Sequence, residues 1–113
     1  LILKKNLKGG VSMGYKIIAD TLGATVTNGK KSITTSSSEI FDADETRKTL
    51  ILTNDSAYDV WLGLGEAAVA DEGLLLAAYG GYLKFDTDGM YEGKIYAIAI
   101  GTATTIAYTQ GVV

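Results

Sequence analysis

The side chains that most often carry out chemistry in proteins are missing from this sequence. Its 113 residues include no cysteine and no histidine. The chain therefore offers no thiolate nucleophile, no zinc site of the thiol type, and no imidazole as a general base or metal ligand. It cannot run a serine–histidine, cysteine–histidine or histidine–metal mechanism alone. We expect a protein that is not an enzyme and that binds no metal or cofactor.

The remaining acidic side chains suggest two kinds of site, and neither has a specific signature. Asp42, Asp44 and Glu45 form an acidic turn. With help from backbone carbonyls they could chelate a hard cation, but a solvated acidic loop is the simpler interpretation. Two carboxylates could also hydrolyse a glycoside, which depends on their spacing in three dimensions. Nothing in the sequence indicates such a pair.

Residues 86–89 (Asp-Thr-Asp-Gly) resemble part of a calcium-binding loop. Aligning Gly89 with the glycine of that loop places Lys84 at the first ligand position and Ile95 at the last. Both positions require carboxylates, so the segment is better interpreted as a turn.

Two further motifs match familiar patterns only superficially. Gly63, Gly65 and Ala68 have the spacing of a dinucleotide fingerprint, but no strand–helix–strand unit follows them. Asn54 and Ser56 match the N-glycosylation pattern, and without an export signal we interpret this segment as a turn.

The aromatic residues are better candidates for binding than any of these motifs. The chain has seven tyrosines and one tryptophan. Such side chains are enriched at protein interfaces, and they can also stack on sugar rings, although about half would simply pack in a sandwich of this size. The aromatic interface candidates are Tyr58, Trp61, Tyr79, Tyr82, Tyr91 and Tyr96.

The alternation around Trp61 makes it the most specific of these candidates. Val60, Leu62 and Leu64 alternate with Trp61 and Gly63. Because successive side chains of a strand point to opposite faces, Trp61 leaves the face that its aliphatic neighbours share. An outward tryptophan indicates an intersheet position or an interface.

These residues must be positioned by strands. Short runs rich in β-branched and aromatic residues recur every 8 to 12 residues or so, separated by Gly, Asn, Asp and Ser, which is typical of an all-β fold. We predict an antiparallel, jelly-roll-like β-sandwich of eight to nine short strands with an extended N-terminal arm. The strongest runs are 49–53, 60–64, 74–76, 82–85, 94–100 and 104–109.

The first third of the chain gives weaker signals. Residues 15–19 and 24–27 are candidate strands, and Asn28-Gly29 predicts a tight hairpin turn, because type I′ turns need positive φ at both central positions. Residues 30–35 would return from that turn. Phe41 ends a brief strand and is expected to face the core, and 66–70 is the only segment where a turn of helix is expected.

Three segments carry a resemblance to a known family: TRKTLILTNDSAYDVWLGLG, LLLAAYGGYLKF and GKIYAIAIGTATTIAYTQG. Across residues 34–111 the chain resembles the small auxiliary capsid, or head-decoration (cement), β-sandwich proteins of tailed bacteriophages. The resemblance implies a structural protein on the exterior of the virion, made in the host cytoplasm. It also implies that the protein docks on the major capsid protein, bridges adjacent subunits, and forms a homo-oligomer, either dimer or trimer.

Charge divides the chain into an arm and a body. Lys4, Lys5, Lys8 and Lys16 are the only charges before Asp20 and give +4, while the rest of the chain sums to −7. An acidic body is poorly suited to nucleic acid. We expect residues 1–14 to be an extended basic arm on a neighbouring protein, with Lys4, Lys5 and Lys8 as interface candidates, and residues 15–113 to form one sandwich domain.

Other interpretations of the arm remain open. It could be a frayed tail, or Met13 could be the true start, since Lys8 to Val11 can be encoded by a bacterial ribosome-binding sequence. No apolar window approaches the length of a membrane span, and Leu1-Ile2-Leu3 precedes the lysines, which inverts the order of a signal peptide. We therefore expect no membrane partner.

A second class of function fits the same fold. A carbohydrate-binding or adhesin-type β-sandwich would use Trp61 and the tyrosines as stacking platforms. It would lack a catalytic site for the same reasons. Binding to glycans or to empty capsids distinguishes the two.

Overall fold

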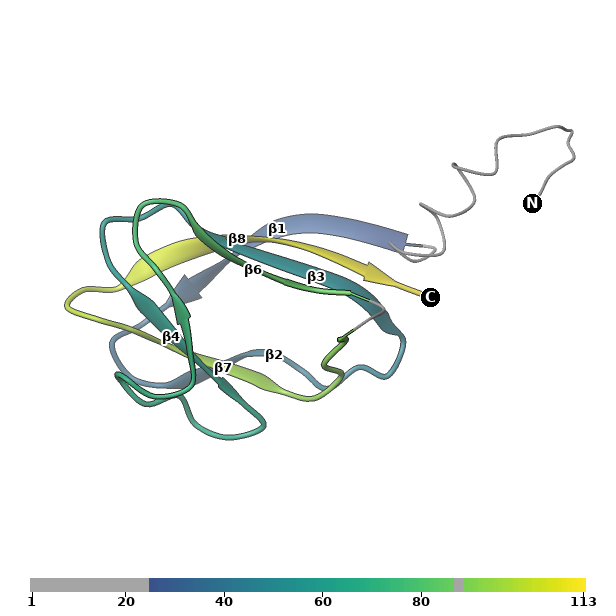
Figure 1. Cartoon of the computed structure of the whole chain (residues 1–113), viewed down its shortest axis with the longest axis horizontal. Coiled ribbons are helices and arrows are strands. Elements are labelled where there is room, and N and C mark those ends of the chain that lie inside the picture. Colours follow the sequence, from purple (N-terminus) through teal and green to yellow (C-terminus); the bar gives the residue numbers. More distant parts are fainter. Residues whose placement is uncertain (1–24, 87–88) are drawn as a thin grey trace, which may run out of the picture.

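The computed structural model describes residues 25–86 and 89–113. Within them the chain is all-β, without a helix, and forms two antiparallel sheets of four strands each (Figure 1). The predicted antiparallel β-sandwich is confirmed. The strands are β1 (Thr25–Ile33), β2 (Ser38–Phe41), β3 (Arg47–Asn54), β4 (Val60–Leu64), β5 (Leu74–Leu76), β6 (Gly81–Phe85), β7 (Ile95–Ala99) and β8 (Thr104–Val112).

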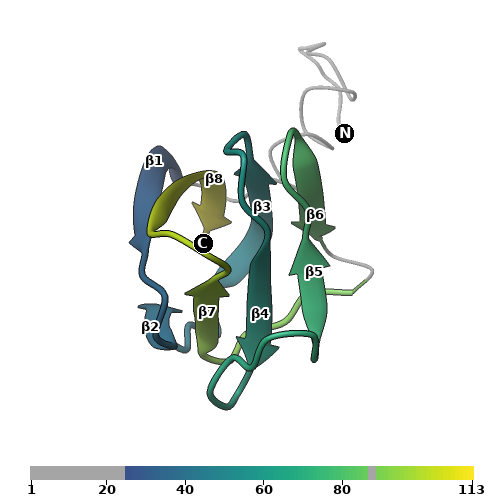
Figure 2. The ribbon, with the colours of Figure 1, turned by 90° about the vertical axis from the view of Figure 1, so that its left-hand side faces the viewer.

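The strand order is that of a jelly roll. Sheet A has the order β1-β8-β3-β6 and sheet B the order β2-β7-β4-β5. The antiparallel pairs β1–β8, β2–β7, β3–β6 and β4–β5 are those of one long hairpin rolled into a sandwich. Figure 2 shows the result as two layers, in which β1 lies over β2, β8 over β7, β3 over β4, and β6 over β5.

Alternation along the strands builds the core between the layers. Val60 and Leu62 of β4 are fully buried, whereas Trp61 between them is only partly buried and lies on the opposite face. Phe41 is buried, as predicted. The apolar cluster consists of Ile33, Ile40, Phe41, Leu50, Leu52, Val60, Leu62, Leu76, Ile95, Ala97, Ala99 and Ile106.

The predicted turn at Asn28-Gly29 is wrong, because both residues lie in the middle of the continuous strand β1. Asn28 pairs with Thr109 and Gly29 with Tyr108 of β8. The Thr109 hydroxyl donates to Asn28 Oδ1 at 2.6 Å. A Cβ on Gly29 would lie 2.9 Å from the Tyr108 ring, so this glycine makes room for a cross-strand aromatic side chain rather than for a turn.

The helical turn expected at 66–70 is also absent, and the segment is part of the irregular loop between β4 and β5. Ala68 is buried there, and its backbone N–H donates to Ser37 Oγ at 2.8 Å. The loop folds back over β4 so closely that a Cβ on Gly63 would lie 2.5 Å from the carbonyl oxygen of Glu66. The glycine of the apparent dinucleotide motif is therefore a packing position.

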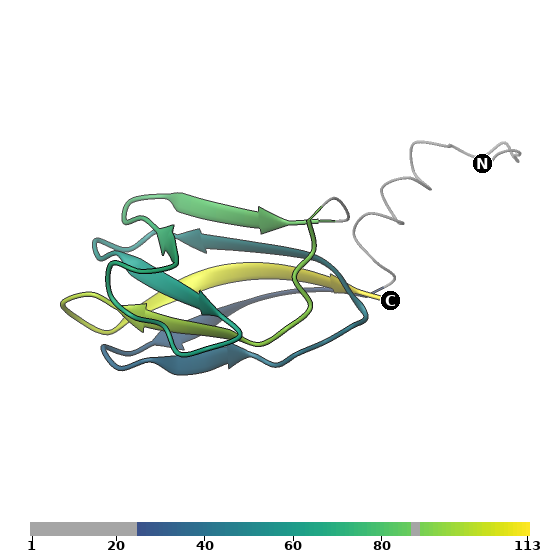
Figure 3. The same cartoon turned by 60° about the horizontal axis from the view of Figure 1, so that its bottom comes forward.

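The two sheets differ in length, and this positions a pocket. β1 and β8 have nine residues each, whereas β2 has four and β7 five. Figure 3 shows β1 and β8 continuing past β2 and β7 at one end of the sandwich. The predicted arm (residues 1–14), the candidate strand at 15–19 and Met13 lie outside the described residues, as do Thr87 and Asp88 of the apparent calcium loop.

Candidate functional site

One end of the sandwich carries three of the candidate tyrosines. Tyr58 lies in the loop between β3 and β4, Tyr79 in the loop between β5 and β6, and Tyr82 in β6 opposite Thr53. Their exposed fractions are 43%, 80% and 71%. We call Tyr58, Tyr79 and Tyr82, with loops 55–59 and 77–80, the aromatic end; it faces the viewer in Figure 2.

Backbone hydrogen bonds fix the two loops of the aromatic end to each other. The N–H of Tyr79 donates to the carbonyl of Ser56 at 2.8 Å, and that of Gly80 to the carbonyl of Asn54 at 2.7 Å. The N–H of Ala78 donates to Asp59 Oδ1 at 2.8 Å. These bonds hold Tyr79 at a φ of 61°, which is uncommon for a bulky side chain and costs about 1 to 3 kcal/mol. The most exposed tyrosine of the described part of the chain thus also has a restricted backbone.

Asn54 anchors this arrangement from inside the sandwich. Its side chain is fully buried, and its Nδ2 donates to the carbonyls of Tyr58 at 2.7 Å and Leu76 at 2.9 Å. Its Oδ1 accepts from the N–H of Ser56 at 3.0 Å and from Ser56 Oγ at 2.7 Å. One side chain therefore joins the end of β3, the following loop and β5. This is a structural role for the asparagine of the apparent glycosylation pattern.

Trp61 and Tyr96 lie elsewhere, on the outer face of sheet B. Trp61 pairs with Ile98 of β7 on one side and with Leu75 of β5 on the other. Directly opposed residues point to the same face, so these three apolar side chains form a row across three strands. Tyr96 occupies the neighbouring position and pairs with Glu39 of β2. We call Ile98, Trp61 and Leu75 the outer row.

Tyr91 is partly buried and packs within the fold. Its ring packs partly buried against the core, and its hydroxyl donates to the carbonyl of Lys94 at 3.1 Å. The ring also lies against Gly93 and Gly65, where an added Cβ would approach its hydroxyl oxygen to 2.3 and 3.0 Å. The other candidates, Lys4, Lys5 and Lys8, lie outside the described residues.

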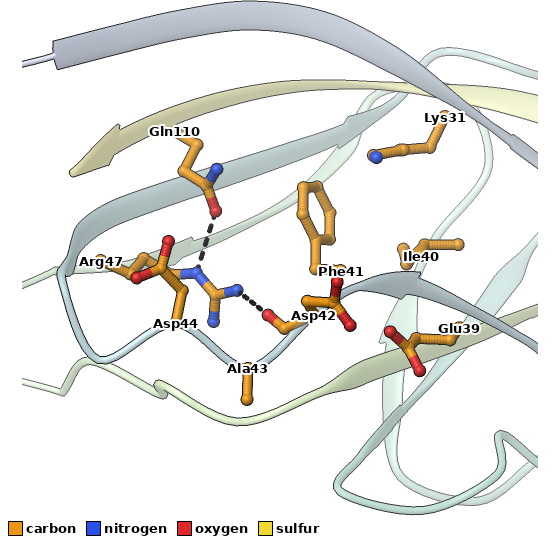
Figure 4. Close-up of a pocket in the computed structure, with 9 residues that line it drawn as sticks. All are labelled: Lys31, Glu39, Ile40, Phe41, Asp42, Ala43, Asp44, Arg47 and Gln110. Atoms are coloured by element: carbon orange, nitrogen blue, oxygen red, sulfur yellow. Dashed lines mark hydrogen bonds between the residues drawn. The ribbon is translucent and has the colours of Figure 1, made fainter.

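A polar pocket of about 410 Å³ lies beside the turn that follows β2 (Figure 4). It contains the acidic turn that the sequence singled out. Its walls come from β1, β2, the turn, β3 and β8. The lining residues are Lys31, Glu39, Ile40, Phe41, Asp42, Ala43, Asp44, Arg47 and Gln110.

Arg47 is the structural centre of this pocket. It is only 1% exposed, and its Nε donates to Gln110 Oε1 at 3.0 Å. One terminal nitrogen donates to the carbonyls of Tyr91 and Gly93 at 2.9 and 3.2 Å, and the other donates to the carbonyl of Asp42 at 2.7 Å. Burial lowers the pKa of the Arg47 guanidinium from its ordinary value. The guanidinium uses most of its donors to tie β3, β8 and two loops together.

Three other charged side chains of the pocket, Asp44, Glu39 and Lys31, have partners within the fold. Asp44 accepts from the hydroxyl of Thr46 at 2.6 Å and from its N–H at 2.9 Å, and these bonds lower the pKa of the Asp44 carboxyl. Glu39 pairs with Lys94 at 3.4 Å, and this contact raises the pKa of Lys94. The Lys31 ammonium lies 4.9 Å from the centre of the Phe41 ring, a cation–π contact.

The contacts of this pocket join the strands and loops that surround it. Over residues 25–86 and 89–113, no three acidic side chains lie where they could hold a metal ion. The aromatic end and the outer row are therefore the stronger candidate binding surfaces.

Sequence reasoning missed two of the residues that organise these sites, Arg47 and Asn54, and the unusual backbone of Tyr79. In the sequence, Arg47 lies between an acidic turn and a predicted strand, a position typical of the surface. Its burial depends on contacts with Tyr91 and Gln110, which are distant in the sequence. The role of Asn54 depends on the distant Leu76. The Gly80-Gly81 pair was a local signal for unusual backbone at Tyr79, because glycines accompany turns that need positive φ.

Comparison with protein-family models, with curated protein sequences and with solved structures gave no match for this chain. Among the described residues no helix is long and apolar enough to span a membrane.

Proposed function

We propose that this chain is a structural virion protein that decorates and stabilises a tailed-phage capsid by binding the major capsid protein. It would act on the capsid exterior as a homo-oligomer, without catalysis or a cofactor. The observation that carries the proposal is the aromatic end, where Tyr79 and Tyr82 are 80% and 71% exposed on loops and strands that the fold holds in place. The resemblance of residues 34–111 to head-decoration proteins supplies the identity of the partner.

The geometry supports binding because it reduces the entropic cost of association. Ordering a flexible side chain at an interface costs roughly 0.5 to 1.5 kcal/mol. The backbone that carries Tyr79 is restricted before any partner arrives, by the hydrogen bond of Tyr79 to Ser56 and that of Gly80 to Asn54. Rigid aromatic side chains are frequent hot spots of protein interfaces. Repetition of such a contact over a capsid lattice multiplies a modest single affinity.

The proposal is tested by sedimentation of the full chain with undecorated capsids. We expect saturable binding that Tyr79→Ala weakens by about 2 kcal/mol, the size of a hot-spot truncation. Val26→Ala is a suitable control for truncation of an exposed apolar side chain. Val26 is about as exposed as Tyr58 of the aromatic end (44% against 43%), but it lies in β1, far along the strand from that end. Absence of binding, or equal losses for both variants, would overturn the proposal.

One observation favours a second candidate, a carbohydrate-binding module. Tyr79 is largely exposed, and its loop is hydrogen-bonded to Ser56 and Asp59; an exposed aromatic side chain on a loop with polar neighbours suits a sugar. Binding of the full chain to a glycan array, lost in Tyr79→Ala and accompanied by no capsid binding, would select this candidate instead.

A further inference from the structure

The outer row is an apolar strip that the described part of the chain leaves partly exposed. Leu75 at the edge strand β5 is 41% exposed, and Trp61 and Ile98 are partly exposed. Their positions in β5, β4 and β7 place them side by side across sheet B. The outer row is thus a continuous apolar contact surface in the middle of a sheet face.

Acidic side chains border this row. From Thr49 to Leu83 the sequence has five carboxylates and no basic residue. Two of them, Glu66 and Glu72, line a hollow of about 160 Å³ where the β4–β5 loop folds over Gly63, together with the exposed Val69. Gly63 is two residues from Trp61 and points to the same face of β4. The surface therefore combines an apolar strip with a small, acidic, partly apolar hollow.

The N-terminal sequence of the chain has the complementary chemistry. Residues 1–8 (LILKKNLK) combine four branched aliphatic side chains with Lys4, Lys5 and Lys8 and have no acidic residue. Residues 25–113 have six basic and twelve acidic side chains, a formal net charge of −6. Aliphatic side chains suit the outer row, and an ammonium group on a long apolar stem suits the hollow with its two glutamates.

We propose that the outer face of sheet B, from the outer row to the hollow at Glu66 and Glu72, binds residues 1–8 of a second copy of this chain. Aliphatic residues of the segment cover Trp61 and its neighbours, and its lysines pair with the two glutamates. The inference goes beyond the proposed function, because it concerns contact between copies and uses a different surface from the aromatic end.

The length of the connection favours a second copy over the same chain. The carbonyl of Thr34, just after β1, accepts from the N–H of Ala99, so the outer row lies near the Ile33 end of β1. The connection to residues 1–8 leaves from Thr25, eight residues away, or about 26 Å along sheet A at 3.3 Å per residue. Sixteen residues separate residue 8 from Thr25, and a random coil of that length would have a typical span of about 22 Å. A neighbouring copy can place its own Thr25 beside the row without stretching this connection.

The experiment uses Trp61 as a built-in probe, because it is the only tryptophan of the chain. We expect the full chain to dimerise on sedimentation analysis, with a blue shift of Trp61 emission as concentration rises. Lys4→Glu/Lys5→Glu should weaken dimerisation by about tenfold or more and abolish the blue shift over the same concentration range. Rising salt should weaken the dimer in the same direction.

Matched variants separate a specific contact from a general effect of charge. Lys30→Glu/Lys48→Glu makes the same change of net charge at two exposed positions in β1 and β3. Its dimer dissociation constant should stay within about twofold of that of the parent chain. Glu66→Lys/Glu72→Lys, combined with Lys4→Glu/Lys5→Glu, should restore it by exchanging the charges. Tyr79→Ala should leave dimerisation unchanged, which keeps this test separate from capsid binding.

Three results would each overturn the proposal. The first is a chain that stays monomeric over the whole range of protein concentration and whose Trp61 is accessible to quenchers. The second is a monomer in which Trp61 is shielded at every dilution, since the segment would then cover its own sheet. The third is a dimer that responds equally to the two lysine-reversal pairs.

Discussion

Replacing Asn54 with alanine should destabilise the fold far more than an ordinary loop substitution. The buried side chain makes four hydrogen bonds, and its removal leaves the carbonyl of Leu76 buried without that donor. A buried carbonyl without its partner costs about 1 to 3 kcal/mol, and the other bonds contribute about 1 kcal/mol more. The carbonyl of Tyr58 adds little, because it also accepts from Ser56 Oγ at 3.0 Å. We expect a total loss of about 2 to 4 kcal/mol.

Urea unfolding followed by Trp61 fluorescence measures this loss, because the single tryptophan lies in β4 next to the affected loops. Ser56→Ala is the matched control. It removes a hydroxyl that bonds to Asn54 and to Tyr58 but leaves the Leu76 contact intact, so it should cost about 1 kcal/mol or less. A loss below about 0.5 kcal/mol for Asn54→Ala, or equal losses for the two variants, would refute the anchoring role of Asn54.

Three further predictions concern the body of the sandwich. Gly29→Ala should cost about 1 to 3 kcal/mol through overpacking against Tyr108, and a double-mutant cycle with Tyr108→Leu should recover most of that loss. The lowered pKa of Asp44 means that its bonds to Thr46 stabilise the fold above the unfolded pKa of about 3.9, and that this stability is lost as pH falls through the folded pKa. Thr46→Val should therefore show a smaller fall of the melting temperature between pH 5 and pH 2 than the parent chain; an unchanged fall would contradict the assignment. Thermal unfolding with and without a strong chelator should superimpose, because the chain has no histidine or cysteine; a drop of several degrees would reveal a bound metal.

The strands that the sequence predicted best are those whose faces differ clearly. In β4, apolar residues on one face and Trp61 on the other gave both the strand and the direction of Trp61, because the alternation is local information. The strand predicted at 49–53 proved longer, since β3 begins at Arg47 and ends at Asn54. Two of its additional residues, Arg47 and Asn54, are polar and buried, and partners distant in sequence determine their burial.

The errors have the same physical origin. Asn28-Gly29 has a strong local preference for a turn, but pairing of β1 with β8 over nine positions overrides it. Residues 66–70 have helical composition, yet the loop around them lies against Gly63 and Ser37 and stays irregular. For the candidate site, the sequence singled out Tyr58, Tyr79 and Tyr82 individually. It did not bring them to one end, because that requires the strand order of the two sheets.

The rolled-hairpin strand order has a consequence for how the chain is synthesised and folds. Among the eight described strands, β4 and β5 are the only sequence neighbours that pair within one sheet, so they can associate as soon as they leave the ribosome. β1 pairs with β8, and Thr25 meets Val112, 87 positions later. Of the described strands, β1 is made first but is therefore among the last to find its place, and it waits with an unpaired edge while the rest of the chain emerges. Such long-range pairing makes folding slow, and it exposes β1 to wrong partners during that interval.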